Sequence, residues 1–190
     1  DNLHLYQKLE KSVIHNDIND NNIIVSNDFL NPTVKSVIDF GDAVFSQTIN
    51  DLAITCSYGI MNLNDPLSGC IDILEGYNQN RKVKDNELKL LYNLIAMRLV
   101  ISSIKVNGES TSSINKYKEP DNKYLLISEK SAWNLLNKWS EIDSEFAYYS
   151  FRKACSLDAH PGKKKFDKWA KTQSDIHGML ELESEFEGGK

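Results

Sequence analysis

Apolar residues recur along most of the chain at the spacing of an amphipathic helix. The clearest case runs from residue 85 to about 108, where one apolar face and its margins comprise Leu88, Leu91, Ile95 and Leu99, with Leu90, Leu94, Met97, Ile101 and Ile104 beside them. So broad an apolar surface predicts a central helix with others packed around it. Similar spacing predicts helices over the first dozen residues, up to residue 61, from 66 onward, over 124–139 and over 144–155.

Capping residues mark several of these boundaries. Asn50 or Asp51 can cap the helix that ends near residue 61. Asp65 can cap the next helix with Pro66 at its first position, and Asp143 can cap the helix that ends near residue 155. Helices therefore dominate the chain from residue 50 onward.

Two short β-rich runs interrupt the helical pattern near the start. Residues 23–25 and 34–38 are rich in Ile and Val, and the turn-forming segment 26–33 separates them. They predict a small hairpin. The fold class is therefore α+β: a mainly α-helical lobe with a β-hairpin at one edge.

Composition narrows the classes of function. The chain has 190 residues, 41% of them hydrophobic, which suits one compact unit. With 22 basic and 27 acidic residues the net charge is −5, and no basic run predicts a nucleic-acid groove. The longest uncharged apolar stretch, 52–61, is too short to cross a bilayer. Three cysteines without a C-x-x-C pattern argue against a disulfide framework or zinc site, so we expect a cytoplasmic protein.

The chemistry-bearing residues gather between positions 15 and 42. His15, Asp17 and Asn22 form the pattern H-x-D-x4-N, and Asp39 opens a D-F-G after the predicted hairpin. Phosphoryl transfer to a hydroxyl needs a carboxylate that orients the nucleophile and accepts its proton. It also needs oxygen ligands that hold Mg²⁺ against the phosphates. Asp17, Asn22 and Asp39 supply that set.

This segment resembles the catalytic loop and metal-binding motif of the aminoglycoside phosphotransferase superfamily, which shares its fold with protein kinases. The resemblance implies a kinase-like C-terminal lobe in which Asp17 is the catalytic base. Asn22 and Asp39 would be the Mg²⁺ ligands, and His15 would pack the loop. Asn16 stands where protein kinases carry Arg, which favours a small-molecule kinase.

Further positions follow from the same resemblance. Ile24 and Ile38 would form the floor of the nucleotide-base site. The run 50–53, Asn-Asp-Leu-Ala, is similar to a helix start in which the Asp, here Asp51, hydrogen-bonds the backbone of the catalytic loop. The phosphate donor would be ATP or GTP.

The runs 124–133 and 151–155 resemble the hydroxylysine kinase branch, in which the kinase domain is often fused to a class III aminotransferase-like domain. The acceptor class implied is a hydroxylated amine or amino acid, hydroxylysine-like or aminoglycoside-like. We assign residues 1–158 to the lobe and 159–190 to a linker or tail. The chain begins without Met, and its nine glycines form no G-x-G. We therefore expect a fragment that lacks its N-terminal kinase lobe in cis and is inactive alone.

Other interpretations remain open at this stage. A non-catalytic C-lobe scaffold would keep the helical core but ignore magnesium and nucleotide, and a metal-dependent phosphohydrolase would transfer phosphate to water. Asp42 could touch a second metal or brace a loop. Arg98, set in the apolar helix, could reach a phosphate, but an ion pair with a carboxylate such as Asp51 is the preferred interpretation.

Overall fold

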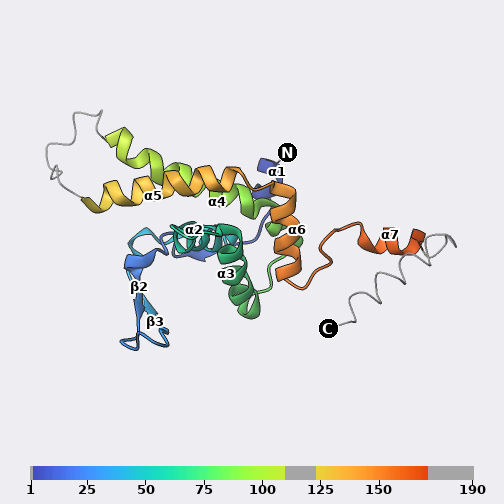
Figure 1. Cartoon of the computed structure of the whole chain (residues 1–190), viewed down its shortest axis with the longest axis horizontal. Coiled ribbons are helices and arrows are strands. Elements are labelled where there is room, and N and C mark those ends of the chain that lie inside the picture. The colour runs from blue at the N-terminus through green and yellow to red at the C-terminus, as the bar shows by residue number, and fades with distance from the viewer. Residues whose placement is uncertain (1, 110–122, 171–190) are drawn as a thin grey trace.

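The computed structural model describes residues 2–109 and 123–170. Most of its helices form one body, and the hairpin strands lie at one side of it (Figure 1). The fold is α+β, as predicted. Within the described residues the helices are α1 Asn2–Gln7, α2 Ile49–Gly59, α3 Pro66–Asn80, α4 Asp85–Glu109, α5 Lys123–Ser140, α6 Ser144–Ala154 and α7 Lys163–Ala170.

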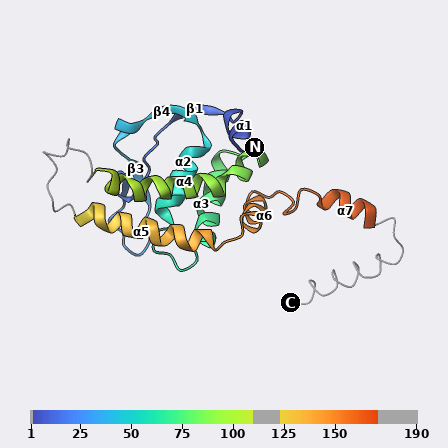
Figure 2. The same ribbon diagram turned by 90° about the horizontal axis from the view of Figure 1, so that it is seen from above.

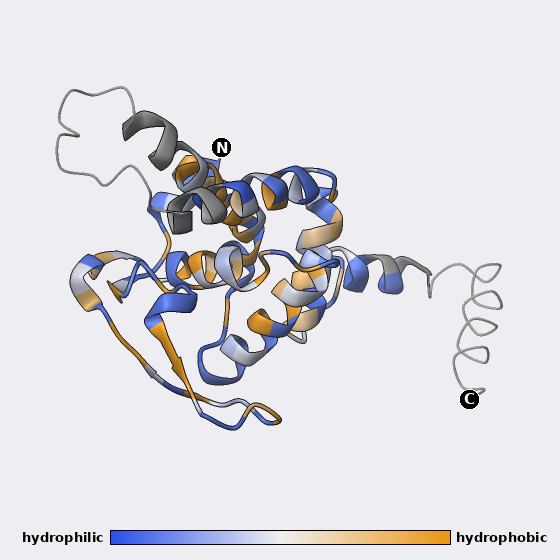
Figure 3. Ribbon diagram, turned by 60° about the vertical axis from the view of Figure 1, so that its left-hand side comes forward, coloured by the Kyte–Doolittle hydropathy of each residue, from blue (hydrophilic) through white to orange (hydrophobic). Residues whose placement is uncertain are grey.

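The predicted hairpin is present. Strand β2, Ile23–Val25, pairs antiparallel with β3, Val34–Val37, and it projects from the helical body as an arm with exposed apolar stretches (Figures 1 and 3). A second antiparallel pair was not predicted: β1, Lys11–Ile14, aligns with β4, Val44–Gln47. Thus the helix expected over the first dozen residues is shorter, ending at Gln7, and the chain then becomes extended.

Helix α4 is the centre of the core. Leu88, Leu91, Ile95 and Leu99 are fully buried, as the periodicity predicts. Helices α4 and α5 lie side by side in both views, while α2 and α6 pack on other parts of α4 (Figures 1 and 2). The apolar margin is not buried throughout, because Met97 is 58% exposed. That margin instead borders a cavity described below.

Two of the three predicted caps are correct. The Asp65 carboxylate accepts a hydrogen bond from Ser68 N at 3.0 Å, and Asp143 accepts one from Phe146 N at 2.8 Å. The cap predicted at Asn50 or Asp51 is wrong, because α2 begins at Ile49, after Thr48. Asn50 and Asp51 lie inside the first turn, where their side chains are free to reach other segments.

The remaining expectations concern the chain ends and the loop before α5. The loop predicted over 109–123 falls almost entirely outside the described residues, as does the tail beyond 170. Helix α7 lies apart from the helical body in both views (Figures 1 and 2). None of the helices within 2–109 and 123–170 combines the length and apolar character needed to cross a membrane.

A polar cluster ties the start of α4 to α6. Tyr148 donates a hydrogen bond to Asp85 Oδ1 at 2.6 Å, and the Arg152 guanidinium pairs with the same oxygen. Partial burial alone would raise the pKa of the Asp85 carboxyl, but these two hydrogen bonds outweigh it and hold the pKa below its ordinary value of 3.8.

Truncating the core face of α4 should cost far more stability than truncating its margin. We expect Leu91→Ala to lower the free energy of unfolding by about 2–5 kcal/mol, because Leu91 is fully buried and leaves a cavity. Met97→Ala, on the same helix but exposed, should cost about 0.5 kcal/mol or less. Urea denaturation of both variants measures this. Equal losses would contradict the assigned core.

Acid should weaken the contact between α4 and α6. Because the pKa of Asp85 is lower in the folded state, its contribution to stability is present above the ordinary value and is lost as pH falls through the lowered one. Between about pH 5 and pH 2, Asp85→Asn should therefore lose less free energy of unfolding than the wild type. Asp72→Asn, at an exposed position of α3, should follow the wild type. A wild-type pH profile for Asp85→Asn would contradict this account.

Candidate active site

The loop that joins β1 to β2 is anchored to α2 by one carboxylate. Asp51 Oδ2 accepts a hydrogen bond from His15 N at 3.0 Å, and Asp51 Oδ1 accepts one from Asn16 N at 2.8 Å. Asn16 has φ of 66°, a left-handed conformation that most side chains avoid but that Asn tolerates. The carboxylate thus makes the loop contact expected from the sequence, and it holds the backbone in a sharp turn just before Asp17.

His15 connects the loop to the hairpin. Its Nε2 lies 2.9 Å from Ile38 O, and Asp17 N donates to its Nδ1 at 3.3 Å. Since a carbonyl only accepts and an amide N–H only donates, the neutral ring protonated at Nε2 satisfies both contacts. The ring is buried and lies 4.7 Å from that of Phe40. His15 therefore fills a packing position and does not face open space.

Asp17 and Asn22 are brought into direct contact. Asn22 Nδ2 donates to Asp17 O at 2.8 Å and to Asp17 Oδ2 at 3.2 Å, and Asn19 Nδ2 donates to the same Oδ2 at 3.0 Å. Because the Asn22 amide nitrogen is used in this way, its Oδ1 is the atom left for a cation. The five-residue spacing thus closes the loop on itself.

Asp39 lies at the opposite side of the same hairpin end. Ile38 N donates to Asn22 O at 2.9 Å, which places Asp39 next to the end of the loop 15–22. Asp39 is exposed, its φ is 63°, and its Oδ1 accepts from Gly41 N at 3.3 Å. Among the described residues, no three His, Cys, Asp or Glu side chains cluster as a metal site. The Asn22 amide oxygen and the Asp39 carboxylate are oxygen donors of the kind that Mg²⁺ takes beside phosphate and water.

Ile24 and Ile38 lie on the two chain segments of the hairpin. Ile24 aligns with Ser36, and Ile38 directly follows β3, where its N–H donates to Asn22 O at 2.9 Å. Their exposed fractions are 44% and 42%. The pair offers an apolar surface beside Asp39.

The site contains one partner that the sequence reasoning assigned wrongly. Arg98 Nη2 lies 2.8 Å from Asp17 Oδ1, so its ion pair is with Asp17 and not with Asp51, which is already occupied by two backbone amides. Tyr58 OH is 3.0 Å from the same nitrogen. An arginine within an apolar helical stripe indicates an ion pair, but helical spacing does not reveal which carboxylate forms it.

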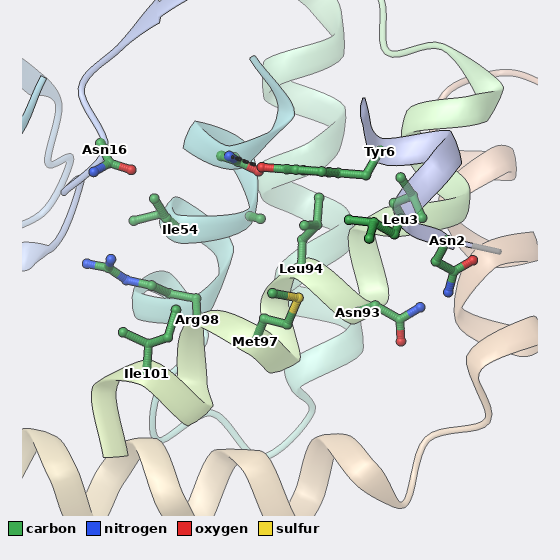
Figure 4. Close-up of a pocket in the computed structure, with 13 residues that line it drawn as sticks. Asn2, Leu3, Tyr6, Asn16, Ile54, Asn93, Leu94, Met97, Arg98 and Ile101 are labelled. Carbon is green, nitrogen blue, oxygen red and sulfur yellow. Dashed lines mark hydrogen bonds between the residues drawn. The ribbon is translucent and has the colours of Figure 1, made fainter. Parts of the chain in front are cut away.

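A cavity of about 390 Å³ lies between α1, α2 and α4, next to this ion pair. Figure 4 shows Asn16 and Arg98 at one side of it, with Leu3 and Tyr6 of α1 at the other. Asn50 Nδ2 donates to Tyr6 OH at 2.8 Å, which fixes the far wall. The cavity therefore opens beside the loop 15–22.

Removing the Asp51 anchor should loosen the loop selectively. We expect Asp51→Ala to lower the free energy of unfolding by about 1.5–3 kcal/mol and to speed amide hydrogen exchange at His15 and Asn16, since both N–H groups lose a charged acceptor. Asp65→Ala is the matched control, because it also removes a carboxylate that accepts from a backbone amide, at α3. Unchanged exchange at residues 15 and 16 in Asp51→Ala would contradict the anchor.

Two comparisons with known proteins match parts of this chain. The phosphotransferase enzyme family matches residues 1–72. Hydroxylysine kinase of Xenopus laevis is 28% identical over 142 residues, covering 71% of this chain and 36% of the relative, so the chain spans about a third of that protein's length. No solved structure matches the chain significantly. Both matches confirm the predicted resemblance to the aminoglycoside phosphotransferase superfamily and its hydroxylysine kinase branch. Residues 1–72, which contain every residue of the predicted site, are therefore similar to the phosphotransferase enzyme family.

Proposed function

We propose that this chain forms the catalytic-loop lobe of a small-molecule kinase. The reaction is transfer of the γ-phosphate of ATP or GTP to the hydroxyl of a small hydroxylated amine or amino acid. The observation that carries the proposal is the closed loop in which Asn22 holds Asp17, with Asp39 at the adjoining hairpin end. The name of the relative, hydroxylysine kinase, supports an amino acid as the acceptor.

Asp17 is the proposed base. The acceptor hydroxyl oxygen forms a bond to the γ-phosphorus while the bond from that phosphorus to the bridging oxygen breaks. The bridging oxygen keeps the electron pair and leaves with the nucleoside diphosphate. The hydroxyl proton passes to the Asp17 carboxylate, whose orientation is held by Asn19 and Asn22.

Asn22 Oδ1 and the Asp39 carboxylate would hold Mg²⁺. When bound, the ion neutralises charge on the phosphate oxygens. The Asn22 side chain is preset by its hydrogen bonds to Asp17, so the position of the ligand is coupled to that of the base. Ordering both through one amide favours a fixed distance between the metal and the proposed base.

Ile24 and Ile38 would pack against the nucleotide base. Beyond them, large apolar side chains of the hairpin and its neighbourhood are exposed, including Phe29 at 94% and Leu30 at 90%. An apolar surface of this kind supports our proposal that an N-terminal kinase lobe covers the site in the whole protein. We also propose that the whole protein carries an aminotransferase-like domain fused to the kinase. Cys56, Cys70 and Cys155 are free and buried, which is compatible with a reducing, cytoplasmic setting.

Replacing the proposed base should abolish most of the activity without disturbing the fold. In the protein that carries this chain, we expect Asp17→Asn to lower kcat/KM for acceptor phosphorylation by about 10²- to 10⁴-fold, because the amide cannot accept the hydroxyl proton. Asp28→Asn, at the hairpin turn, is the control and should leave the rate unchanged. Phosphorylated acceptor is measured directly by mass spectrometry. A near-normal rate for Asp17→Asn would sink the assignment.

A further inference from the structure

The two carboxylate oxygens of the proposed base are held in different ways. Asp17 Oδ2 accepts two hydrogen bonds, from Asn19 Nδ2 at 3.0 Å and from Asn22 Nδ2 at 3.2 Å. Asp17 Oδ1 accepts one, from Arg98 Nη2 at 2.8 Å. Each oxygen of an ionised carboxylate has two lone pairs that can accept. Within the part of the chain that the structure describes, Oδ2 is therefore filled, whereas Oδ1 keeps one position for a further donor.

Arg98 is itself fixed from two directions. It lies on α4 between Ile95 and Leu99, which are fully buried in the core, so its backbone is held by packing. Its Nη2 has two N–H groups, one of which donates to Asp17 Oδ1 and the other to Tyr58 OH at 3.0 Å. The guanidinium carbon also lies 5.3 Å from the centre of the Tyr58 ring. Asp17 Oδ1 is thus tied to the helical core through a side chain that is immobilised at both ends.

This ion pair is sheltered from solvent, and one donor of the arginine is unpaired. The side chains of Arg98 and Asp17 are 13% and 27% exposed, so salt and water screen the pair less than they would at the surface. Arg98 Nε is buried and has no hydrogen-bond partner among the described residues. A buried donor without a partner costs stability. An arginine with that cost favours a role in the reaction over a role in holding the fold together.

We propose that Arg98 is a positioning residue for phosphoryl transfer: it orients Asp17 so that the open position of Oδ1 receives the acceptor hydroxyl. The inference rests on the kinase function proposed above. As the hydroxyl oxygen bonds to the γ-phosphorus, its proton moves to Oδ1, and the departing nucleoside diphosphate keeps the electron pair of the broken bond. Arg98 acts through Asp17 and makes no contact with phosphate. Its contribution is geometric, and a misplacement of about 1 Å can cost about 100-fold in rate.

A cycle of single and double variants tests this role in the protein that carries this chain, with phosphorylated acceptor measured by mass spectrometry. Arg98→Met should lower kcat by about 10- to 100-fold and leave KM for the nucleotide within about twofold. Added to Asp17→Asn, the same change should alter kcat by less than about twofold, because the side chain that Arg98 orients no longer accepts the proton.

Two further variants separate this role from a general effect on the fold. Lys89→Met removes a cation from a more exposed part of α4 and should keep the wild-type kcat. If thermal unfolding shows that Arg98→Met does not fold, Arg98→Lys takes its place in the cycle. Lysine keeps the charge but loses the planar group, so kcat should fall less, again without a further fall beside Asp17→Asn.

The outcomes distinguish this inference from the proposed function. A further fall in kcat of about tenfold or more in the double variant would mean that Arg98 acts on phosphate directly, and it would overturn the inference. A wild-type kcat in Arg98→Met, or a raised nucleotide KM with kcat unchanged, would also overturn it and leave the kinase standing. Should Asp17→Asn have no measurable rate, this split between kcat and KM decides. Absence of phosphorylated product with the wild type would reject both proposals.

Discussion

The site depends on the two hydrogen bonds that Asp51 accepts from the amides of His15 and Asn16. Asp51 lies in the first turn of α2, and α2 packs against the central helix α4. A carboxylate near a helix N-terminus is itself stabilised by the helix dipole. The loop 15–22, the proposed catalytic loop, has little apolar surface of its own and is thus attached to the helical core through this side chain.

From that anchor, polar contacts continue toward the hairpin. His15 reaches Ile38 O, and Asn22 joins the loop to the strand through its own carbonyl and through Asp17. Two of these contacts, from His15 and from the Asn22 amide, pair a side chain with a backbone carbonyl, and the contact of Ile38 N with Asn22 O joins two backbone groups. The loop, the proposed metal ligands and the helical core therefore form one connected unit, and Arg98 of α4 closes it from the opposite side.

The periodicity of apolar residues was enough to predict α4. The capping residues themselves were enough to predict the caps at Asp65 and Asp143, because both kinds of feature are local. The contact between Asp17 and Asn22 was also accessible, since the two residues are five positions apart on one tight loop. The pairing of β1 with β4 was missed: each strand has four residues, too few for an alternating pattern to stand out, and the paired residues are 30 to 36 positions apart, as in Ile14 with Val44 and Lys11 with Gln47. The partner of Arg98 lies 81 positions away, and only the packed structure decides between Asp17 and Asp51.

Magnesium-dependent consumption of nucleotide by the protein that carries this chain, followed by phosphorus NMR of the products, tests the central claim most directly. With hydroxylated amino acids, hydroxylated amines and water as competing acceptors, the account predicts a phosphate monoester on a hydroxyl compound. Inorganic phosphate as the sole product would instead indicate a phosphohydrolase. No consumption of nucleotide with any acceptor would indicate a scaffold and would contradict the assignment of Asp17, Asn22 and Asp39 to catalysis.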